Sequence, residues 1–263
     1  MLKTIGKITK YPRLTLKYPR KPMDNSLFLG APEIDRTMCT LCGECERRCP
    51  SRAIVIDRAA AGIGINMDEC VFCALCADIC PAGAARMSNE FELAQKDRGI
   101  LRVSAPQQDG GTITGETLEN LEDRLAENIK KKFGRSLQIR EVDAGSCNGC
   151  DYEANALNNP FNDVERLGIH FVASPRHADM LLVTGCVSRN MELALIKTYN
   201  ATPDPKLVVA VGACACSGGI FRDAYAVRHG IGSVLPVDVF VPGCPPRPQA
   251  IMHGILKAIN RIK

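Results

Sequence analysis

The feature that most constrains this chain is a cysteine phrase that occurs twice. "CTLCGECERRCP" begins at Cys39, and "CVFCALCADICP" begins at Cys70. Each copy reads C-x2-C-x2-C-x3-C-P, and corresponding cysteines stand 31 residues apart. A repeat of this kind indicates an internal duplication with two related structural units. The spacing predicts that reduced cysteines in this part of the chain bind metal at two related sites.

The spacing is that of bacterial ferredoxins, in which the fourth cysteine of each run serves the other [4Fe–4S] cluster. A tight loop turns three thiolates toward one cluster, backbone N–H groups point at its sulfurs, and the proline ends the wrap. Zinc is the alternative, but zinc usually takes its ligands from two C-x2–4-C pairs. The predicted ligand sets cross over between the runs: Cys39, Cys42, Cys45 and Cys80 for one cluster, and Cys70, Cys73, Cys76 and Cys49 for the second.

Composition fits a globular protein in a reducing compartment. The chain has 263 residues, 46% of them hydrophobic, which suits one large domain or two small ones. It has fourteen cysteines, but no apolar segment near the N-terminus directs it to an oxidising compartment. The longest apolar runs, such as residues 207–211, are far shorter than the roughly 18 residues needed to span a bilayer. We therefore expect any membrane association to be peripheral or through partners.

The first 24 residues form a basic arm. They contain seven lysines and arginines and no acidic residue before Asp24, although the net charge of the whole chain is only +4. Pro12, Pro19 and Pro22 interrupt any helix, so the arm is expected to be extended. We favour a solvated or partner-docking tail over attraction to anionic lipids. Nucleic acid is not expected as a partner, because two tyrosines in a short arm form no stacking platform.

The C-terminal half has the pattern of an α/β domain. Short runs rich in β-branched residues alternate with helical segments, which implies a parallel sheet covered on both faces, a doubly wound domain. The expected strands are residues 137–142, 169–172, 180–184, 207–211 and 237–241. The expected helices lie near residues 151–167, 188–199 and 248–262.

Six further cysteines follow these expected strands. Ligands of open parallel sheets bind outside the carboxyl ends of the strands, so cysteines far apart in sequence are brought to one edge. Glycine stands beside cysteine in "GSCNGCD", "GACACSGG" and "GCPPRP", which lets the backbone approach a bulky group. Together they favour a third metal cluster over six small buried hydrophobes. The six are Cys147, Cys150, Cys186, Cys214, Cys216 and Cys244.

Between the two cysteine-rich parts, "SAPQQDGGTITG" at residues 104–115 is typical of a linker. An apolar stripe over residues 116–133 predicts an amphipathic packing helix. We divide the chain into a basic arm (1–24), a two-cluster domain (25–98), a linker with the helix (99–135) and the α/β domain (136–263).

Two known families resemble these parts. Residues 9–98, with "LTLKYP" and "INMDECVFCALC", resemble the two-cluster ferredoxin-like subunit of respiratory complex I and of related membrane-bound hydrogenases. Residues 136–262, with "GSCNGCDYE", "SPRHAD", "GACACSGGIF" and "PVDVFVPGCPPRPQAI", resemble the small subunit of energy-converting [NiFe] hydrogenases of the formate hydrogenlyase type. That family also includes the complex I subunit that holds the last cluster before quinone. Its complex I members have adjacent cysteines at the first position, so the C-x2-C here favours the hydrogenases.

The resemblance implies an α+β ferredoxin-like domain followed by a flavodoxin-like α/β domain. It leaves Cys186, where the family commonly has proline, and Cys216 unbound, and inert packing is favoured for both over a redox role. Glu153 is expected near the cluster, either assisting proton movement or simply packing. By motif position, the implied ligands of a third [4Fe–4S] cluster are Cys147, Cys150, Cys214 and Cys244.

The expected function is an electron relay through three clusters, as a subunit of an oxidoreductase complex. No P-loop, G-x-G-x-x-G or nucleophile elbow is present, so no independent active site is expected. The resemblance implies a [NiFe] large subunit, an electron donor (a ferredoxin, or a formate or CO dehydrogenase-type module) and integral membrane subunits that pump ions, on the cytoplasmic face. The alternatives are a complex I-like quinone or sulfane oxidoreductase and a free ferredoxin-type carrier. Structural or surface roles are expected for His170, His177, His229 and His253.

Overall fold

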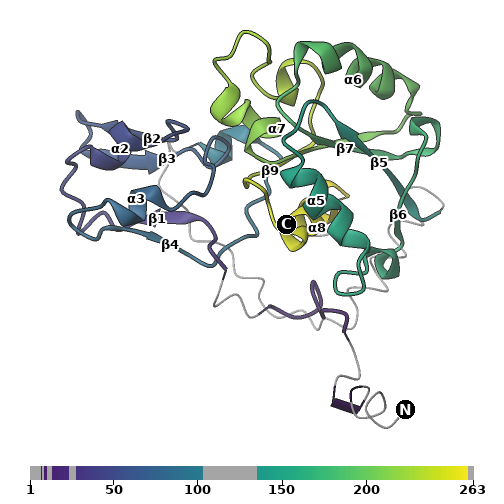
Figure 1. Ribbon diagram of the computed structural model, residues 1–263, viewed down its shortest axis with the longest axis horizontal. Helices are drawn as coiled ribbons and strands as arrows, with labels where there is room; N and C mark the ends of the chain where they lie inside the picture. The colour runs from purple at the N-terminus through teal and green to yellow at the C-terminus, as the bar shows by residue number, and fades with distance from the viewer. Residues whose placement is uncertain (1–6, 8, 11–13, 24–27, 103–134, 260–263) are drawn as a thin grey trace.

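The computed structural model describes residues 7, 9–10, 14–23, 28–102 and 135–259. The expected linker at 104–115 and the expected helix at 116–133 lie outside these residues. Figure 1 shows a smaller unit beside a larger one. We call residues 28–102 the first half and residues 135–259 the second half.

The first half consists of two antiparallel ribbons and two short helices. Strand β1 (Pro32–Ile34) pairs with β4 (Ala85–Met87), and β2 (Ile54–Asp57) pairs with β3 (Gly62–Ile65). Each helix lies within one of the two cysteine runs. Isoleucines at alternate positions of β2 and β3 are buried, as the two-residue period of a strand requires. The helices are α2 (Glu44–Arg48) and α3 (Leu75–Asp78).

The second half is built on a parallel sheet with the strand order β6-β5-β7-β8-β9. The expected parallel sheet is confirmed, and the bounds of β7 and β8 coincide with the prediction. Every residue of β7 is buried, because both faces of the sheet are covered. The strands are β5 (Leu137–Asp143), β6 (Ile169–Phe171), β7 (Met180–Thr184), β8 (Leu207–Val211) and β9 (Val239–Val241).

Helices pack on both faces of this sheet (Figure 1). Helices α5 (Gly149–Asn155) and α8 (Pro248–Ala258) join Leu182 and its neighbours in one apolar cluster. Helices α6 (Arg189–Ala201) and α7 (Ala213–Ser217) join Leu181 in the other. Within the described ranges, no helix has both the length and the apolar character needed to cross a bilayer.

The single helix predicted over residues 151–167 is wrong. Helix α5 ends at Asn155, and two short 3-10 turns follow, η2 (Ala156–Asn158) and η3 (Val164–Leu167). Between the turns, the Asn159 side chain accepts hydrogen bonds from the backbone N–H groups of Phe161 and Asn162. Pro160 has no N–H to continue a helix. Local side-chain bonding of this kind favours a turn over a helix.

The N-terminal strap, residues 14–23, lies along the second half. Leu16 N donates to Phe161 O at 2.8 Å, and Arg166 donates to Tyr18 O. Tyr18 is only 4% exposed, and its hydroxyl donates to the Glu92 carboxylate at 2.9 Å. The pKa of Tyr18 is raised because the ring is buried and Glu92 is negative. The expectation of a solvated tail is therefore wrong for this part of the arm.

A buried residue, Asp68, lies where the two halves meet. Asp68 is inaccessible to solvent, and its carboxylate accepts hydrogen bonds from Arg98 Nε at 2.6 Å and Arg102 Nε at 3.0 Å. The backbone carbonyl of Asp68 accepts from Ser217 Oγ of α7 at 2.7 Å. Both arginines belong to η1 (Arg98–Leu101) or follow it directly. Residues 99–102, which we assign to the linker, thus pack against the first half.

We predict that the strap stabilises the second half. Replacing Tyr18 by Ala should lower the free energy of unfolding by about 3 kcal/mol, because a buried ring is lost and leaves a cavity. Replacing it by Phe should cost about 1 kcal/mol, the value of one hydrogen bond. Denaturant unfolding followed by circular dichroism measures both.

The matched control is Tyr225→Ala, since Tyr225 is 86% exposed. It should change stability by no more than about 0.5 kcal/mol. Equal effects of the two alanine variants would contradict the packed strap.

Candidate metal centres

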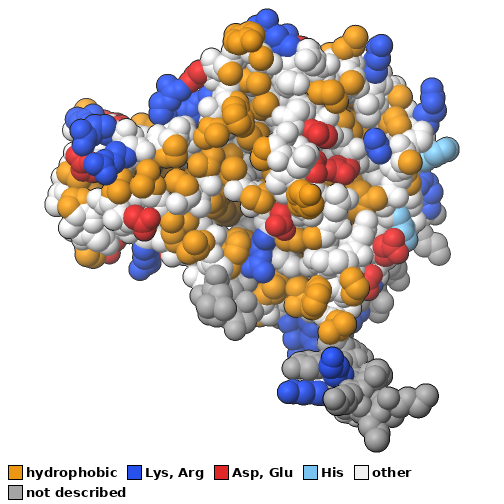
Figure 2. Space-filling model, viewed as in Figure 1, with side chains coloured by type: hydrophobic (Ala, Val, Ile, Leu, Met, Phe, Trp, Pro, Cys, Tyr) orange, Lys and Arg blue, Asp and Glu red, His pale blue; other side chains and the backbone are white. Residues whose placement is uncertain are grey.

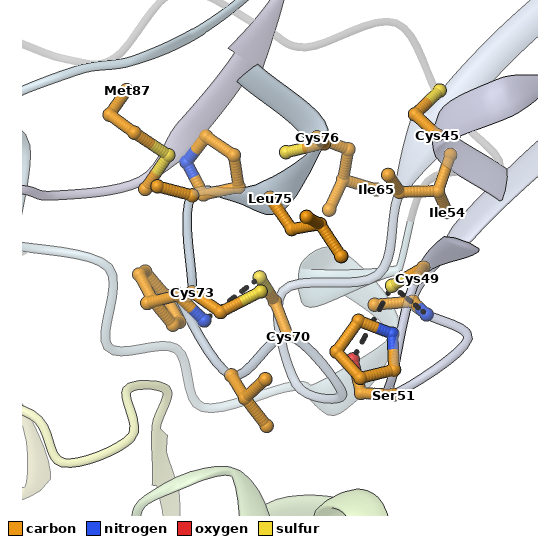
Figure 3. Close-up of a pocket in the computed structure, with 16 residues that line it drawn as sticks. Cys45, Cys49, Ser51, Ile54, Ile65, Cys70, Cys73, Leu75, Cys76 and Met87 are labelled. Atoms are coloured by element: carbon orange, nitrogen blue, oxygen red, sulfur yellow. Dashed lines mark hydrogen bonds between the residues drawn. The ribbon is translucent and has the colours of Figure 1, made fainter. Parts of the chain in front are cut away.

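Two cavities lie side by side in the first half, and cysteines line both. One is bordered by Cys49 of the first run together with the first three cysteines of the second run. Figure 3 shows the thiols of Cys49, Cys70, Cys73 and Cys76 around it, with Cys45 further off beyond Cys76. The other cavity is bordered by Cys39, Cys42, Cys45 and Cys80. These are the groupings that the crossed ligand sets require, and Cys45 borders both cavities.

The duplication is visible in the backbone as well as in the sequence. Leu41 (φ 55°) and Gly43 (φ 81°) have left-handed conformations, and so do Phe72 (φ 54°) and Ala74 (φ 62°), 31 residues later. Residues other than glycine rarely adopt such backbone angles, and strained backbone of this kind is concentrated at functional positions. The second residue of each pair directly precedes α2 or α3. The same bend therefore turns both cysteine loops around their cavities.

The surroundings of these thiols suit an iron–sulfur cluster. Three backbone N–H groups donate to cysteine sulfurs: Ala53 N to Cys49 Sγ at 3.3 Å, Phe72 N to Cys70 Sγ at 3.4 Å, and Ala84 N to Cys80 Sγ at 3.2 Å. Such donors favour thiolate over thiol. Burial raises the pKa of Cys70 to about 12, and the neighbouring cysteines add to the shift. A bound metal cation would favour the thiolate there.

No three His, Cys, Asp or Glu side chains of the described residues converge closely enough to hold a single metal ion. In the first half, the thiols border cavities instead.

A third group of thiols lies at the carboxyl edge of the sheet. Cys147 and Cys150 follow β5, Cys214 lies in α7 after β8, and Cys244 follows β9. Burial raises the pKa of Cys150, and the negative charges of Cys214 and Cys244 raise it further. Burial likewise raises the pKa of Cys214 to about 12, with added repulsion from Cys244, Cys186 and Cys147. The sheet thus gathers four predicted ligands and Cys186 into one neighbourhood.

Glycines leave room for a bulky group among these thiols. Gly212 has φ +91°, and a Cβ added there would lie 2.5 Å from Cys150 Sγ. Gly219 has φ +54°, and a Cβ there would lie 3.1 Å from Cys214 Sγ. Any other residue at Gly212 would push into the site and strain the backbone. The residues present therefore fit a [4Fe–4S] cluster at this edge.

Cys214 and Cys216 face different directions. In an extended segment, residues two apart would face the same side, but this segment is the helix α7. Side chains two apart on a helix are separated by about 200° around its axis, so they point to nearly opposite sides. Cys216 is fully buried in the apolar cluster, with Sγ 3.8 Å from Ala210 O, whereas Cys214 is half-buried at the edge. The geometry thus separates two cysteines that spacing alone could not.

Cys186 lies against the third site. It is 6% exposed, and its thiol donates to Gly145 O at 3.4 Å. Burial raises its pKa, and Asp143 and Cys147 add to the shift. The structure therefore places Cys186 beside the predicted ligands, whereas Cys216 points into the core.

Polar residues that the sequence reasoning missed brace the loop of Cys147. The Asp151 carboxylate accepts from Ser146 Oγ and from Thr184 Oγ1, the latter at 2.7 Å. Ser146 Oγ accepts from Asn148 N at 2.9 Å. The sequence signal for these hydrogen bonds is a serine immediately before the C-x2-C and an aspartate immediately after it, because both residue types favour local turns. These bonds fix the path of the loop.

Glu153 and the histidines differ in their placement. Burial raises the pKa of Glu153, and the positive charge of the nearby Arg247 partly offsets this rise. Glu153 and Arg247 therefore lie near each other beside the third site. His253 is buried in α8, which lowers its pKa to about 4. His170 is in β6, and His229 borders an open basin on the surface. None of the four histidines borders either first-half cavity.

The helix that carries Cys214 contacts the backbone beside the second cysteine run: Ser217 Oγ of α7 donates to Asp68 O at 2.7 Å, two residues before Cys70. Burial raises the pKa of Cys244, and the negative charges of Cys147 and Cys73 raise it further. Cys73 borders the cavity of Figure 3. The third group of thiols therefore lies on the side of the second half that contacts the second cysteine run.

Comparison with known proteins agrees with this arrangement. A family model described as "NADH ubiquinone oxidoreductase, 20 Kd subunit" matches residues 147–258. A second model, "4Fe-4S dicluster domain", matches residues 38–84. The two models fall on the second and the first half respectively.

Among curated relatives, a probable membrane-bound hydrogenase subunit mbhJ of Pyrococcus furiosus is 48% identical over 55% of this chain and 86% of its own length. Formate hydrogenlyase subunit 7 of Escherichia coli is 41% identical over 62% of this chain and 64% of its own. An NADH-quinone oxidoreductase subunit of Geobacter metallireducens is 49% identical over 43% of this chain and 66% of its own. The chain thus spans slightly under two thirds of the last two relatives.

We predict different effects for the cysteines at the sheet edge. Replacing Cys147, Cys150, Cys214 or Cys244 by Ala should abolish the EPR signal of a third cluster and leave the two first-half signals intact, because the first-half cavities have their own thiols. Cys216→Ser should leave the third signal present, since Cys216 points into the core. EPR of the dithionite-reduced protein measures these signals.

Cys186→Ser is expected to keep the signal with an altered potential, because the residue contacts the ligand loop without being a predicted ligand. Loss of the signal in Cys216→Ser but not in Cys214→Ala would overturn the assignment.

Proposed function

We propose that this chain is an electron-relay subunit. The premise is that it belongs to the family of the 20 kDa subunit of NADH ubiquinone oxidoreductase and carries a 4Fe-4S dicluster domain ahead of the part that matches this family. The complex we propose is a membrane-bound, ion-translocating hydrogenase. The chain passes electrons between a low-potential donor and a [NiFe] large subunit. The chemistry at nickel and iron belongs to that partner.

The observation that carries this proposal is the contiguity of three cysteine sites. Cys45 borders both first-half cavities, and α7, which carries Cys214, donates from Ser217 to the backbone of Asp68, two residues before Cys70. Electrons pass between protein-bound centres only when the centres are close. A series of neighbouring sites is what a relay needs, and it needs no substrate pocket of its own.

The proposed cofactors are three [4Fe–4S] clusters, each of which accepts and releases one electron when bound. Cys39, Cys42, Cys45 and Cys80 would hold one, and Cys70, Cys73, Cys76 and Cys49 the second. Cys147, Cys150, Cys214 and Cys244 would hold the third.

We assign the first half a ferredoxin-like fold and the second a flavodoxin-like fold. The strand order β6-β5-β7-β8-β9 supports the latter, because it corresponds to the 2-1-3-4-5 order of flavodoxin.

Exposed apolar residues beside the third site support docking of a large subunit there. Tyr152 is 75% exposed two residues after Cys150, and Ile220 and Phe221 are 52% and 44% exposed just after α7. Figure 2 shows hydrophobic side chains gathered on the face between the first half and α5. Apolar and aromatic residues of this kind are enriched at the centres of interfaces. The complex would sit on the cytoplasmic face of the membrane, held there by integral membrane subunits.

A complex I-like oxidoreductase is the second candidate, because the NADH-quinone oxidoreductase relative is 49% identical over the matched region. The C-x2-C spacing of Cys147 and Cys150 favours the hydrogenase, since the complex I members of the family have adjacent cysteines there.

Anaerobically purified protein should contain roughly twelve iron and twelve sulfide per chain, as three [4Fe–4S] clusters require. Metal analysis and sulfide determination measure this content. Stoichiometric zinc with little iron would contradict the proposal, and roughly eight iron per chain would remove the third site from it.

The chain should co-purify with a nickel-containing large subunit. The complex should evolve hydrogen from a reduced viologen dye, while the isolated chain should not, because it lacks a catalytic metal of its own. Gas chromatography measures the product. A complex that contains no nickel and reduces quinone would establish the complex I-like candidate instead.

A further inference from the structure

The loop that carries Cys244 is fixed at both ends. It connects β9 to α8 and runs through Pro245 and Pro246 to Arg247, which precedes the first turn of α8. At its start, Gly243 O accepts from Ala213 N of α7 at 2.8 Å. At its end, the Arg247 side chain reaches toward residues of the N-terminal part of the chain. The contacts made by Arg247 therefore influence the position of Cys244.

Aromatic rings from the N-terminal part surround Arg247. Its guanidinium carbon lies 4.4 Å from the centroid of the Phe28 ring and 5.0 Å from that of Phe91. The two rings meet edge to face with centroids 6.2 Å apart, and Tyr18 packs on Phe91 at 5.5 Å. We call Tyr18, Phe28 and Phe91 the aromatic cage. A planar guanidinium can stack on such rings and still donate hydrogen bonds at its edge, which a lysine ammonium cannot do.

Hydrogen bonds hold the other edge of Arg247. Its Nε donates to Gln249 Oε1 at 2.7 Å, and Gln249 Nε2 donates to Asn162 Oδ1 at 2.6 Å. Gln249 and Asn162 are 5% and 4% exposed, so these bonds are shielded from water. Arg247 is thus held between a buried polar pair of the second half and the rings of Phe28 and Phe91, with Tyr18 packed behind Phe91.

The segment that carries Phe91 is itself fastened to β9. Gln95 N donates to Phe240 O at 3.0 Å, and Phe240 N donates to Gln95 O at 2.8 Å. Phe91 and Tyr18 also belong to the apolar cluster that contains α5 and α8. The cage is therefore a rigid support for Arg247, built by residues outside the α/β domain.

We propose that Arg247 and the aromatic cage hold the Cys244 loop in place, and so set the spacing between the second and third clusters. Cys244 stands three residues before Arg247, and its loop accepts from Ala213 of α7, the helix whose Ser217 donates to Asp68 O two residues before Cys70. Arg247 is a positioning residue and binds no cluster itself. The spacing of clusters rests on the proposed function, whereas the support of the loop by the cage does not.

Two variants test the proposal in the purified complex. Arg247→Lys keeps the charge and loses the planar stack, and Phe91→Leu removes a ring and keeps Arg247. In both, the backbone amides of Gly243, Cys244 and Arg247 should exchange with deuterium roughly threefold to tenfold faster, because a shielded cation–π contact is lost. The spin–spin splitting between the reduced second and third clusters should also shift, with iron content unchanged.

The matched control is Tyr199→Leu. Lys206 Nζ lies 4.5 Å from the Tyr199 ring, so this variant removes a cation–π pair from the same half, on α6. Neither amide exchange of the Cys244 loop nor the splitting should change in the control. Wild-type behaviour of Arg247→Lys would show that charge alone suffices and would overturn the cage, as would wild-type behaviour of Phe91→Leu.

If the wild-type complex shows no third-cluster signal, the proposed function fails. Amide exchange of the Cys244 loop still decides whether the cage supports it.

Discussion

A hydrogen bond from a side chain of the second half to a buried stretch of backbone in the first half holds the two halves together. Asp68 accepts hydrogen bonds from Arg98 and Arg102, while its backbone carbonyl holds Ser217 of α7. Both arginines belong to the first half, where they pair the buried carboxylate and hold the backbone of Asp68 in place, so it is the bond from Ser217 that crosses between the halves. Asp68 stands two residues before Cys70, and α7 carries a predicted third-site ligand. This bond therefore brings the backbone beside the second cysteine run close to the helix that carries Cys214.

The parts of the fold that local signals determine could be predicted from the sequence. Strands β7 and β8 coincide with their predicted bounds because each is an apolar run that both faces of the sheet bury. The first-half cysteines could be grouped because their spacing is periodic. The break after α5 could also have been read, since Asn158, Asn159 and Pro160 are poor helix formers. There, turn chemistry outweighs the apolar pattern.

Other features depend on contacts that no local pattern contains. Tyr18 looks like one more residue of a basic, proline-rich tail, and only its partners 74 and 148 residues away explain its burial. The orientations of Cys214 and Cys216 depend on a five-residue helix whose sequence, ACACS, carries no helix signal. In the sequence, Arg247 looks like one more residue of a cysteine motif. Its role is visible only in the structure, where the rings of Phe28 and Phe91 lie against its guanidinium.

The N-terminal strap has a consequence for how the molecule is made. Tyr18 leaves the ribosome early, but the arginine that binds its carbonyl is 148 residues further on. At rates of synthesis of about 5–20 residues per second, that interval is roughly seven to thirty seconds. A segment synthesised well before its partners is therefore among the last to reach its place. Folding of the second half is completed only when the strap docks on it.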